Sequence, residues 1–296
     1  MQTRRSFIKQ AALLTATTIM QPGNMFKKEY KLGLQFYTIR DPLAADLKGT
    51  LQKISGFRYR EAETYGFNGK TYYGQDPKVF AQMLADNNIT TSSGHYDLDK
   101  YILGNSTQDD MKRYVDQCID GAHTLKQDYI VWPWLDPSWR SMEKFKHLAQ
   151  VLNTIGEQIK KGGLQLAYHN HDFEFVDHNG QIGYDVILNE TDPSLVKLEA
   201  DLYWMSRASA KKPHEWFELQ PGRFVIWHIK DMDKNNPDLH TAVGDGTIDF
   251  RTIMPDANKA GVKHMFVEQG NNYVPDALNC VERSAKYIQR ENLFLI

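Results

Sequence analysis

The chain has 296 residues, of which 41% are hydrophobic and 24% are charged, and its formal net charge is -2. This length suits one large hydrophobic core and falls short of two substantial domains. The balanced charge provides no field that would attract a polyanion, which argues against a nucleic-acid partner. The only cysteines, Cys118 and Cys280, lie far apart in predicted helices, so we expect free thiols rather than a disulfide framework.

The first segment resembles a twin-arginine export signal. Arg4 and Arg5 are followed by Ser-Phe-Ile-Lys and then by the mildly apolar run AALLTATTIM. That run is too short to remain in a bilayer as a spanning helix, so no stable membrane insertion is expected. The alternative is the basic start of an ordinary helix. We expect residues 1–27 to be the signal, with the cleavage point left open, residues 28–296 to be one domain, and the protein to be periplasmic.

The rest of the chain alternates short apolar strands with longer helical patterns, at a spacing of about thirty residues. The predicted strands are residues 30–39, 59–66, 89–96, 128–134, 164–171, 196–204, 224–231 and 264–270. The predicted helices are residues 43–54, 77–87, 107–125, 141–161, 184–190, 213–219, 249–261 and 277–290. Eight such units predict an α/β fold, a closed (β/α)8 TIM barrel. Neither GxGxxG nor GKS/T occurs, which weakens a doubly wound alternative.

In such a barrel the chemistry lies at the carboxyl ends of the strands, where side chains alternate between the helix-facing and inward faces. The apolar residues of each predicted strand identify its outward face. In residues 164–171, Leu164, Leu166 and Tyr168 face outward, which leaves His169 and His171 facing inward. The same test on the other strands predicts these inward polar residues: Glu61, Glu63, Lys197, Glu199, Asp201, His228, Lys230 and Glu268.

Four of these residues, on four consecutive strands, predict a metal site: His169, Asp201, His228 and Glu268. Crowded, buried carboxylates are costly unless a cation neutralises them. Mixed imidazole and carboxylate ligands favour Mn, Zn, Co or Fe over Ca.

Structural interpretations compete with this one for single residues. Lys197 and Glu199 would form a buried ion pair, and His95, after the third strand, would be a hydrogen-bonded structural residue. His178 and His240 are expected to be solvated.

Several motifs resemble the sugar phosphate isomerase/epimerase group of xylose-isomerase-like TIM barrels, which includes inosose dehydratase, sugar 3-epimerases and dehydroshikimate dehydratase. The motifs are GLQFYTIRD from Gly33, YHNHDFEF at 168–175, LEADLYWM at 198–205, WHIKD at 227–231, VGDGTIDF at 243–250 and FVEQ at 266–269. The resemblance covers nearly all of the chain after the signal.

The resemblance implies one divalent metal ion held by one residue from each of the last four barrel strands. Asp201, His228 and Glu268 match three of these positions. Strand five departs from the pattern, because many relatives have a glutamate where this chain has His169. Either His169 binds the metal or Glu174 in the following loop reaches back to it. Inward parity favours His169.

A metal ion held in this way would chelate a carbonyl and a neighbouring hydroxyl and stabilise the enediolate that forms when the α-proton leaves. Glu268 is the candidate base on one side of the substrate, and Glu174, His171 or Glu63 would act on the other. Lys230 would polarise a substrate oxygen or hold a departing hydroxyl. The predicted substrate contacts are Tyr37, Glu63, His95 and Trp204, and stacking walls would come from Trp132, Trp134 and Trp204.

The predicted function is therefore a divalent-metal-dependent isomerase or epimerase of a small sugar or keto-sugar. A lyase or hydratase of 3-keto-glycosides, or an inosose-type dehydratase, would use the same site. An alternative from another functional class is a sugar-binding barrel without catalytic activity, which the missing strand-five glutamate suggests. A DNA-repair endonuclease of this superfold would need more metal ligands and a basic groove. Export argues against a phosphorylated substrate. The expected binding partner is a small carbohydrate, and the sequence leaves open whether the protein forms a homo-oligomer.

Overall fold

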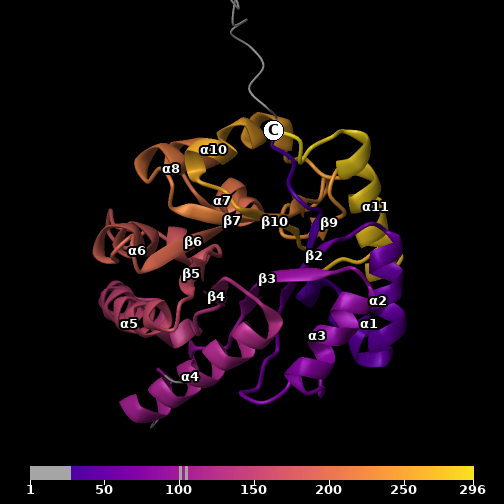
Figure 1. Cartoon of the computed structure of the whole chain (residues 1–296). Coiled ribbons are helices and arrows are strands. Elements are labelled where there is room, and N and C mark those ends of the chain that lie inside the picture. Colours follow the sequence, from indigo (N-terminus) through magenta and orange to yellow (C-terminus); the bar gives the residue numbers. More distant parts are fainter. Residues whose placement is uncertain (1–27, 100–101, 104–105) are drawn as a thin grey trace, which may run out of the picture.

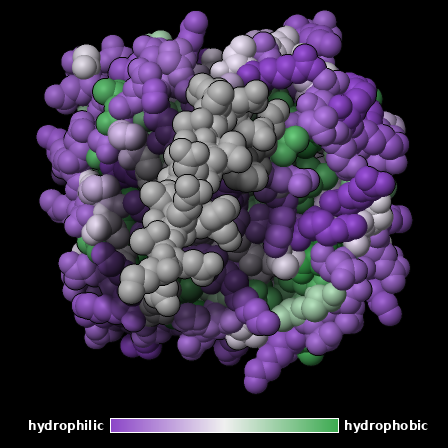
Figure 2. Space-filling model, turned by 45° about the horizontal axis from the view of Figure 1, so that its top comes forward, coloured by the Kyte–Doolittle hydropathy of each residue, from purple (hydrophilic) through white to green (hydrophobic). Residues whose placement is uncertain are grey.

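The computed structural model describes residues 28–99, 102–103 and 106–296. The predicted export signal, residues 1–27, lies outside the described residues. No helix in the described part of the chain combines the length and the apolar composition needed to cross a membrane. On the face that Figure 2 shows, the described surface is mainly hydrophilic, and hydrophobic residues form small separate patches.

Eight parallel strands close into a barrel in the order β1-β10-β7-β6-β5-β4-β3-β2, which confirms the predicted (β/α)8 fold. Figure 1 shows these strands at the centre, with helices arranged around them. Each strand lies within its predicted range and is shorter than it. The strands are β1 Gly33–Gln35, β2 Glu61–Thr64, β3 Thr90–His95, β4 Tyr129–Trp132, β5 Gln165–His169, β6 Val196–Asp201, β7 Phe224–Ile229 and β10 His264–Val267.

The helices follow the predicted periodicity. They are α1 Arg40–Ala45, α2 Leu47–Gly56, α3 Pro77–Asp86, α4 Gln108–Leu125, α5 Met142–Lys161, α6 Gly183–Glu190, α7 Leu202–Ala208, α8 Pro213–Leu219, α9 Phe250–Ile253, α10 Ala257–Ala260 and α11 Ala277–Arg290. Short 3-10 turns are η1 Phe36–Ile39, η3 Pro137–Trp139, η4 Phe173–Phe175 and η5 Met254–Asp256. In α5, residues three or four apart, such as Phe145, Leu148 and Leu152, are buried, so one face of the helix packs on the barrel. Thr107 and Asp110 form a capping box that starts α4.

Part of the barrel interior below the mouth is apolar. A cluster separate from the main core contains Val131, Ala167, Val225, Ile226 and Phe266. Ala167, Ile226 and Phe266 each lie two residues before a predicted metal ligand, so they contribute apolar side chains one pleat below the site. On the outside of β7, Trp227 stacks on Phe217 of α8 with ring centroids 4.9 Å apart, which confirms the predicted parity of this strand.

The sixth predicted strand is wrong beyond Asp201, because α7 begins at Leu202. The Asp201 carboxylate accepts hydrogen bonds from the backbone N–H groups of Tyr203 (2.9 Å) and Trp204 (3.0 Å), so it caps this helix. Asp201 Oδ1 serves as the cap, which leaves Oδ2 for the barrel mouth.

A two-stranded hairpin that was not predicted follows β7. It pairs β8 Asp231–Met232 with β9 His240–Thr241. Asp231 Oδ2 accepts hydrogen bonds from the backbone N–H groups of Gly244 (2.9 Å) and Gly246 (3.1 Å). A Cβ atom at Gly246 would lie 2.2 Å from Asp231 Oδ1, so only glycine fits there. Hydrogen bonds between the motifs WHIKD and VGDGTIDF therefore hold this loop in place beside the mouth.

Candidate active site

The strand ends bring the four predicted ligands together. His169, Asp201, His228 and Glu268 each offer one donor atom, and these four atoms lie within 4.8 Å of one another. All four side chains are buried, with Glu268 the most exposed at 6%. His228 Nδ1 is 3.2 Å from Glu268 Oε2, and His169 Nε2 is 3.9 Å from Asp201 Oδ2. The geometry is that of a compact, water-poor site with mixed ligands.

The donor set fits a divalent transition metal. Two imidazole nitrogens and two carboxylate oxygens match the preferences of Mn, Zn, Co and Fe. Each imidazole also has its second nitrogen turned to a carboxylate below the site. His228 Nε2 lies 2.6 Å from Glu63 Oε2, and His169 Nδ1 lies 2.8 Å from Glu199 Oε2. One nitrogen of each ring is thus available to a cation.

Lys230 places a positive charge beside this set. Its Nζ donates hydrogen bonds to Asp201 Oδ2 (3.1 Å) and Glu268 Oε2 (2.8 Å). Burial alone would lower the pKa of Lys230, but these two carboxylates raise it above its usual value. A bound cation would share Asp201 and Glu268 with this ammonium group.

The carboxylate of Glu268 is ionised. Burial alone would raise its pKa, but the ammonium of Lys230 and the imidazole of His228 hold the pKa well below the usual range. For His228, burial opposes protonation, and the surrounding carboxylates, led by Glu199, outweigh it and raise the pKa. At neutral pH the Glu268 side chain is therefore a carboxylate, in contact with Lys230 and His228.

A second polar layer lies directly below these four residues. Glu63 accepts hydrogen bonds from Gln35 Nε2 (2.6 Å) and Ser93 Oγ (2.7 Å), and its own side chain is fully buried. His95 Nε2 is 2.7 Å from Glu199 Oε2. Burial would lower the pKa of His95, but the carboxylates of Glu63 and Glu199 raise it to about 9.

This layer changes two expectations from the sequence. The partners of Glu199 are imidazoles, so the alternative of a buried pair with Lys197 is not what the structure shows. Glu63, predicted to contact substrate, is fully enclosed by protein groups and is not among the residues that line the mouth cavity described below.

Glu174 lies apart from the four-residue set. Its carboxylate accepts hydrogen bonds from the Tyr168 hydroxyl and from the backbone N–H of His171, both at 2.8 Å. Tyr168 is on the outward face of β5, so Glu174 is held in the layer between barrel and helices. Of these two residues, the structure places His169, and not Glu174, in the four-residue cluster.

Burial raises the pKa of Glu174 from an ordinary 4.5 to about 8. Between these pH values the folded protein keeps a proton that the unfolded chain releases, so stability is greatest at low pH and falls as pH rises through about 8. We expect Glu174→Gln to remove this dependence. Between about pH 5.5 and pH 7.5, the wild type should lose about 2 kcal/mol relative to the variant in urea unfolding of metal-free protein.

Parallel stability curves for the two proteins would contradict this assignment. The same variant tests the ligand question, because Glu174→Gln should bind a divalent metal as tightly as the wild type does. A large loss of metal affinity would instead make Glu174 a ligand.

A cavity of about 370 Å³ opens above the site. Its described lining residues are Tyr37, Tyr65, Gly66, His95, Asp97, Asp99, Pro133, Trp134, His169, His171 and Glu268. Tyr37 and Trp134 are 41% and 44% exposed, so their rings are available to an apolar face of a ligand. Burial and the neighbouring Asp97 raise the pKa of Asp99 to about 7.

The other predicted site residues flank this cavity or lie outside it. His171 stacks on Phe173, and burial lowers the pKa of His171 well below its usual value, so its ring is neutral. Trp204 lies beside His171, and its ring centroid is 5.3 Å from Lys230 Nζ. Trp132 is completely buried and packs in the core.

Sequence reasoning missed several residues near the mouth. Tyr65, Asp97 and Asp99 directly follow the second and third strands, and the strand-end rule would have found them. His240, predicted to be solvated, is instead buried, and its Nδ1 accepts a hydrogen bond from the backbone N–H of Gly270 (2.8 Å). Its burial depends on the hairpin of β8 and β9, for which the sequence gave no clear pattern. His178, also expected in solvent, is half-buried.

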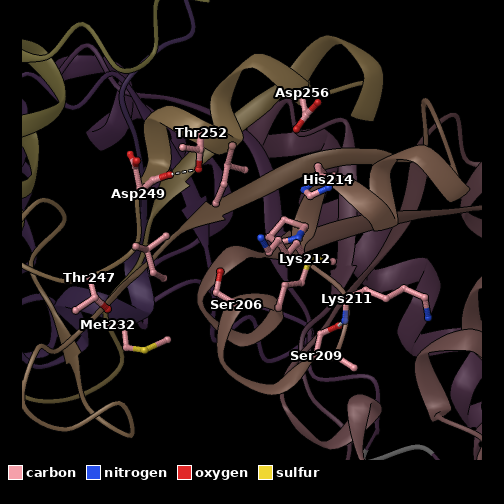
Figure 3. A pocket seen from close by; sticks show the side chains of 15 residues that line it. Ser206, Ser209, Lys211, Lys212, His214, Met232, Thr247, Asp249, Thr252 and Asp256 are labelled. Carbon is pink, nitrogen blue, oxygen red and sulfur yellow. Dashed lines mark hydrogen bonds between the residues drawn. The ribbon is translucent and has the colours of Figure 1, made fainter.

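A second cavity, of about 570 Å³, lies away from these residues, between the segment from α7 to α8 and the start of α9. Figure 3 shows Asp249 and Thr252 on one side of it and Ser206, Ser209 and Lys211 on another. None of the four metal-ligand candidates lines it. This cavity is therefore separate from the four-residue cluster at the barrel mouth.

Comparisons with known proteins agree with this fold. A family model described as xylose isomerase-like TIM barrel matches residues 51–290. A solved sugar phosphate isomerase/epimerase from Parabacteroides distasonis is 27% identical, with a TM-score of 0.77, and the match covers 91% of this chain and 97% of that one. The inosose dehydratase of Bacillus licheniformis is 25% identical over 263 residues, which are 77% of this chain and 85% of that protein.

Other matches are shorter or more distant. Alignments to two further inosose dehydratases cover 44% and 55% of their length, so the chain matches about half of those proteins. The solved structure of an IOLI protein with a bound zinc atom is 16% identical, with a TM-score of 0.66, and the match covers 89% of this chain and 98% of that one. At that identity the likeness concerns the fold alone.

Proposed function

Because the chain belongs to the xylose isomerase-like TIM barrel family, we propose that it is a divalent-metal-dependent isomerase or epimerase of a small sugar or keto-sugar. The observation that supports this most directly is the convergence of His169, Asp201, His228 and Glu268 within 4.8 Å at the carboxyl end of the barrel. Enzymes of this fold use that end for catalysis.

A divalent cation bound there would polarise a substrate carbonyl and acidify the neighbouring C–H group. The Glu268 carboxylate, kept ionised by Lys230 and His228, accepts the proton. His171 faces the same cavity as a neutral imidazole, which is suited to exchange a proton from another direction. Lys230, 2.8 Å from Glu268, positions this base and donates to a substrate oxygen.

The cavity favours an uncharged carbohydrate. The exposed rings of Tyr37 and Trp134 suit the apolar faces of a sugar, and Asp97 and Asp99 suit its hydroxyl groups. Among the described residues that line this cavity, none is Lys or Arg, so its walls offer no basic side chain dedicated to a phosphate group. The resemblance of Arg4, Arg5 and the following residues to a twin-arginine signal supports a periplasmic location, where free sugars are the expected substrates.

A dehydratase or lyase is the second candidate. The proton acceptor Glu268 and the proton donor Lys230 are in direct contact, so one group removes the α-proton while the other assists a departing hydroxyl. The similarity to proteins named inosose dehydratase is consistent with this outcome. Both candidates share the first step and differ in whether a β-substituent leaves.

Incubation of the purified chain with a keto-sugar in deuterated water tests the proposal. We expect the α-proton to exchange for deuterium in the presence of Mn²⁺, Co²⁺ or Zn²⁺, and removal of the metal by a chelator to stop the exchange. NMR of the substrate measures both exchange and product. Exchange with retention of all hydroxyl groups supports the isomerase or epimerase, and loss of water supports the dehydratase.

A protein that binds sugar but neither retains metal nor catalyses exchange would be a sugar-binding barrel, and the proposed function would fail. Elemental analysis of the same preparation provides this second measurement. Exchange that continues unchanged after complete metal removal would also refute the metal dependence.

A further inference from the structure

Glu63 is the most tightly held carboxylate in the polar layer below the candidate metal site. It lies on β2, which is separated from the His228 strand β7 by β1 and β10, and its side chain has no exposed surface. Glu63 Oε2 is 2.6 Å from His228 Nε2 and also accepts a hydrogen bond from Gln35 Nε2 at 2.6 Å. The other carboxylate oxygen accepts a hydrogen bond from Ser93 Oγ at 2.7 Å.

These contacts determine which nitrogen of His228 is free. An ionised carboxylate only accepts hydrogen bonds, so the nitrogen facing Glu63 must bear the hydrogen. A cation that binds His228 displaces one ring proton, and the resulting neutral imidazole has one N–H group and, on its other nitrogen, the lone pair that binds the metal. With Nε2–H directed to Glu63, the lone pair is on Nδ1, 3.2 Å from Glu268 Oε2 and within the ligand set.

We propose that Glu63 is a positioning residue that keeps His228 in the Nε2–H form, with Nδ1 directed to the metal. The inference rests on the proposed metal site and assigns Glu63 a role other than the substrate contact predicted from sequence. Carboxylates that accept the second N–H of a metal-bound histidine fix the orientation of the ring and raise its basicity. Gln35 and Ser93 in turn hold Glu63 in place.

A second cation among His95, His169, Glu199 and His228 is the competing interpretation, since these residues also offer donor atoms within 4.8 Å of one another. It would require both nitrogens of His169 and of His228 to bind metal at once. A second cation also does not account for the hydrogen bonds that the Gln35 amide and the Ser93 hydroxyl donate to Glu63. We therefore expect one tightly bound cation per chain.

The test compares Glu63→Gln with Glu61→Gln. Both residues lie on β2 with the same parity, and each contacts a histidine of another strand, because Glu61 Oε1 is 3.0 Å from His264 Nδ1 at the opposite end of the barrel. A glutamine at position 63 has one acceptor oxygen for the four groups that face Glu63, from Gln35, Ser93, His95 and His228. Its NH₂ group would favour the Nδ1–H form of His228. We expect Zn²⁺ affinity, measured by chelator competition, to fall about 10- to 100-fold in Glu63→Gln and to stay near wild type in Glu61→Gln.

Nitrogen-15 NMR of the Zn²⁺-loaded wild type provides a readout that needs no variant to fold. We expect His228 to show a protonated Nε2 and a metal-bound Nδ1. A metal-bound Nε2, two tightly bound Zn²⁺ ions per chain, or wild-type affinity in Glu63→Gln would overturn the inference. A wild-type chain that binds no Zn²⁺ would instead refute the proposed function, so the two failures are distinguishable.

Discussion

Asp201→Asn is expected to weaken metal binding by at least about 100-fold while the barrel stays folded. Loss of a residue that only supports a metal ligand typically lowers affinity by about 10- to 100-fold, and Asp201→Asn removes a ligand itself. Asp201 Oδ1 caps α7, and an asparagine oxygen can keep that role. The Oδ2 atom faces Lys230 and His169, and an NH₂ group in its place cannot bind a cation. The substitution therefore separates the capping role from the ligand role.

Isothermal titration of the metal-free chain with Mn²⁺ or Zn²⁺ measures this effect. Glu61→Gln is the matched control, because it removes the charge of another carboxylate that is buried in the barrel and contacts a histidine, at the opposite end. Its affinity should equal that of the wild type, and the thermal melting of both variants should show one folded state. Unchanged affinity in Asp201→Asn would remove this residue from the metal site and with it the proposed function.

Glu268→Gln is expected to slow the exchange of the substrate α-proton by about 10² to 10⁴, the usual contribution of a general base. The amide cannot accept a proton at neutral pH, although its oxygen can still face the metal. Because Glu268 is also a predicted ligand, the assay needs saturating metal, confirmed by elemental analysis. Under those conditions the remaining defect reports the loss of the base.

The exchange is measured by NMR in deuterated water, with Glu61→Gln again as the control. The isomerase and the dehydratase both require this step, so the expectation does not depend on the choice between them. Exchange at the wild-type rate in metal-saturated Glu268→Gln would assign the base to another residue, and His171 would then be the first to test.

Most of the candidate site followed from two local rules. Strand parity has a period of two residues, and parallel barrel strands present their carboxyl ends at one mouth. Together they placed His169, Asp201, His228 and Glu268 on one face and at one height, and the structure brings these side chains together, with His95 and Glu199 beside His169 and His228. Tyr65, Asp97 and Asp99 lie just after β2 and β3, where the same strand-end rule applies, and they also line the mouth cavity.

Other features depend on how the chain packs. Glu174 is three residues beyond His171, a spacing that allowed it to reach the metal or to turn away. The η4 turn directs it to the Tyr168 hydroxyl on the outer face of β5. His240 lies in β9 and is buried against Tyr203, Trp204 and Gly270, and two-residue strands leave almost no periodic signal.

The sequence by itself determined the barrel, the number of its strands and the chemical types gathered at its mouth, because hydrophobic periodicity and residue order are local properties of a chain. Only the tertiary structure decided which second groups those side chains meet. Glu63 and His228 are 165 residues apart and touch because the barrel closes, whereas Lys230 meets Asp201 and Glu268 because β7 pairs with β6 on one side and with β10 on the other. Contacts across a closed sheet depend on the tilt and register of all its strands, which no single segment encodes.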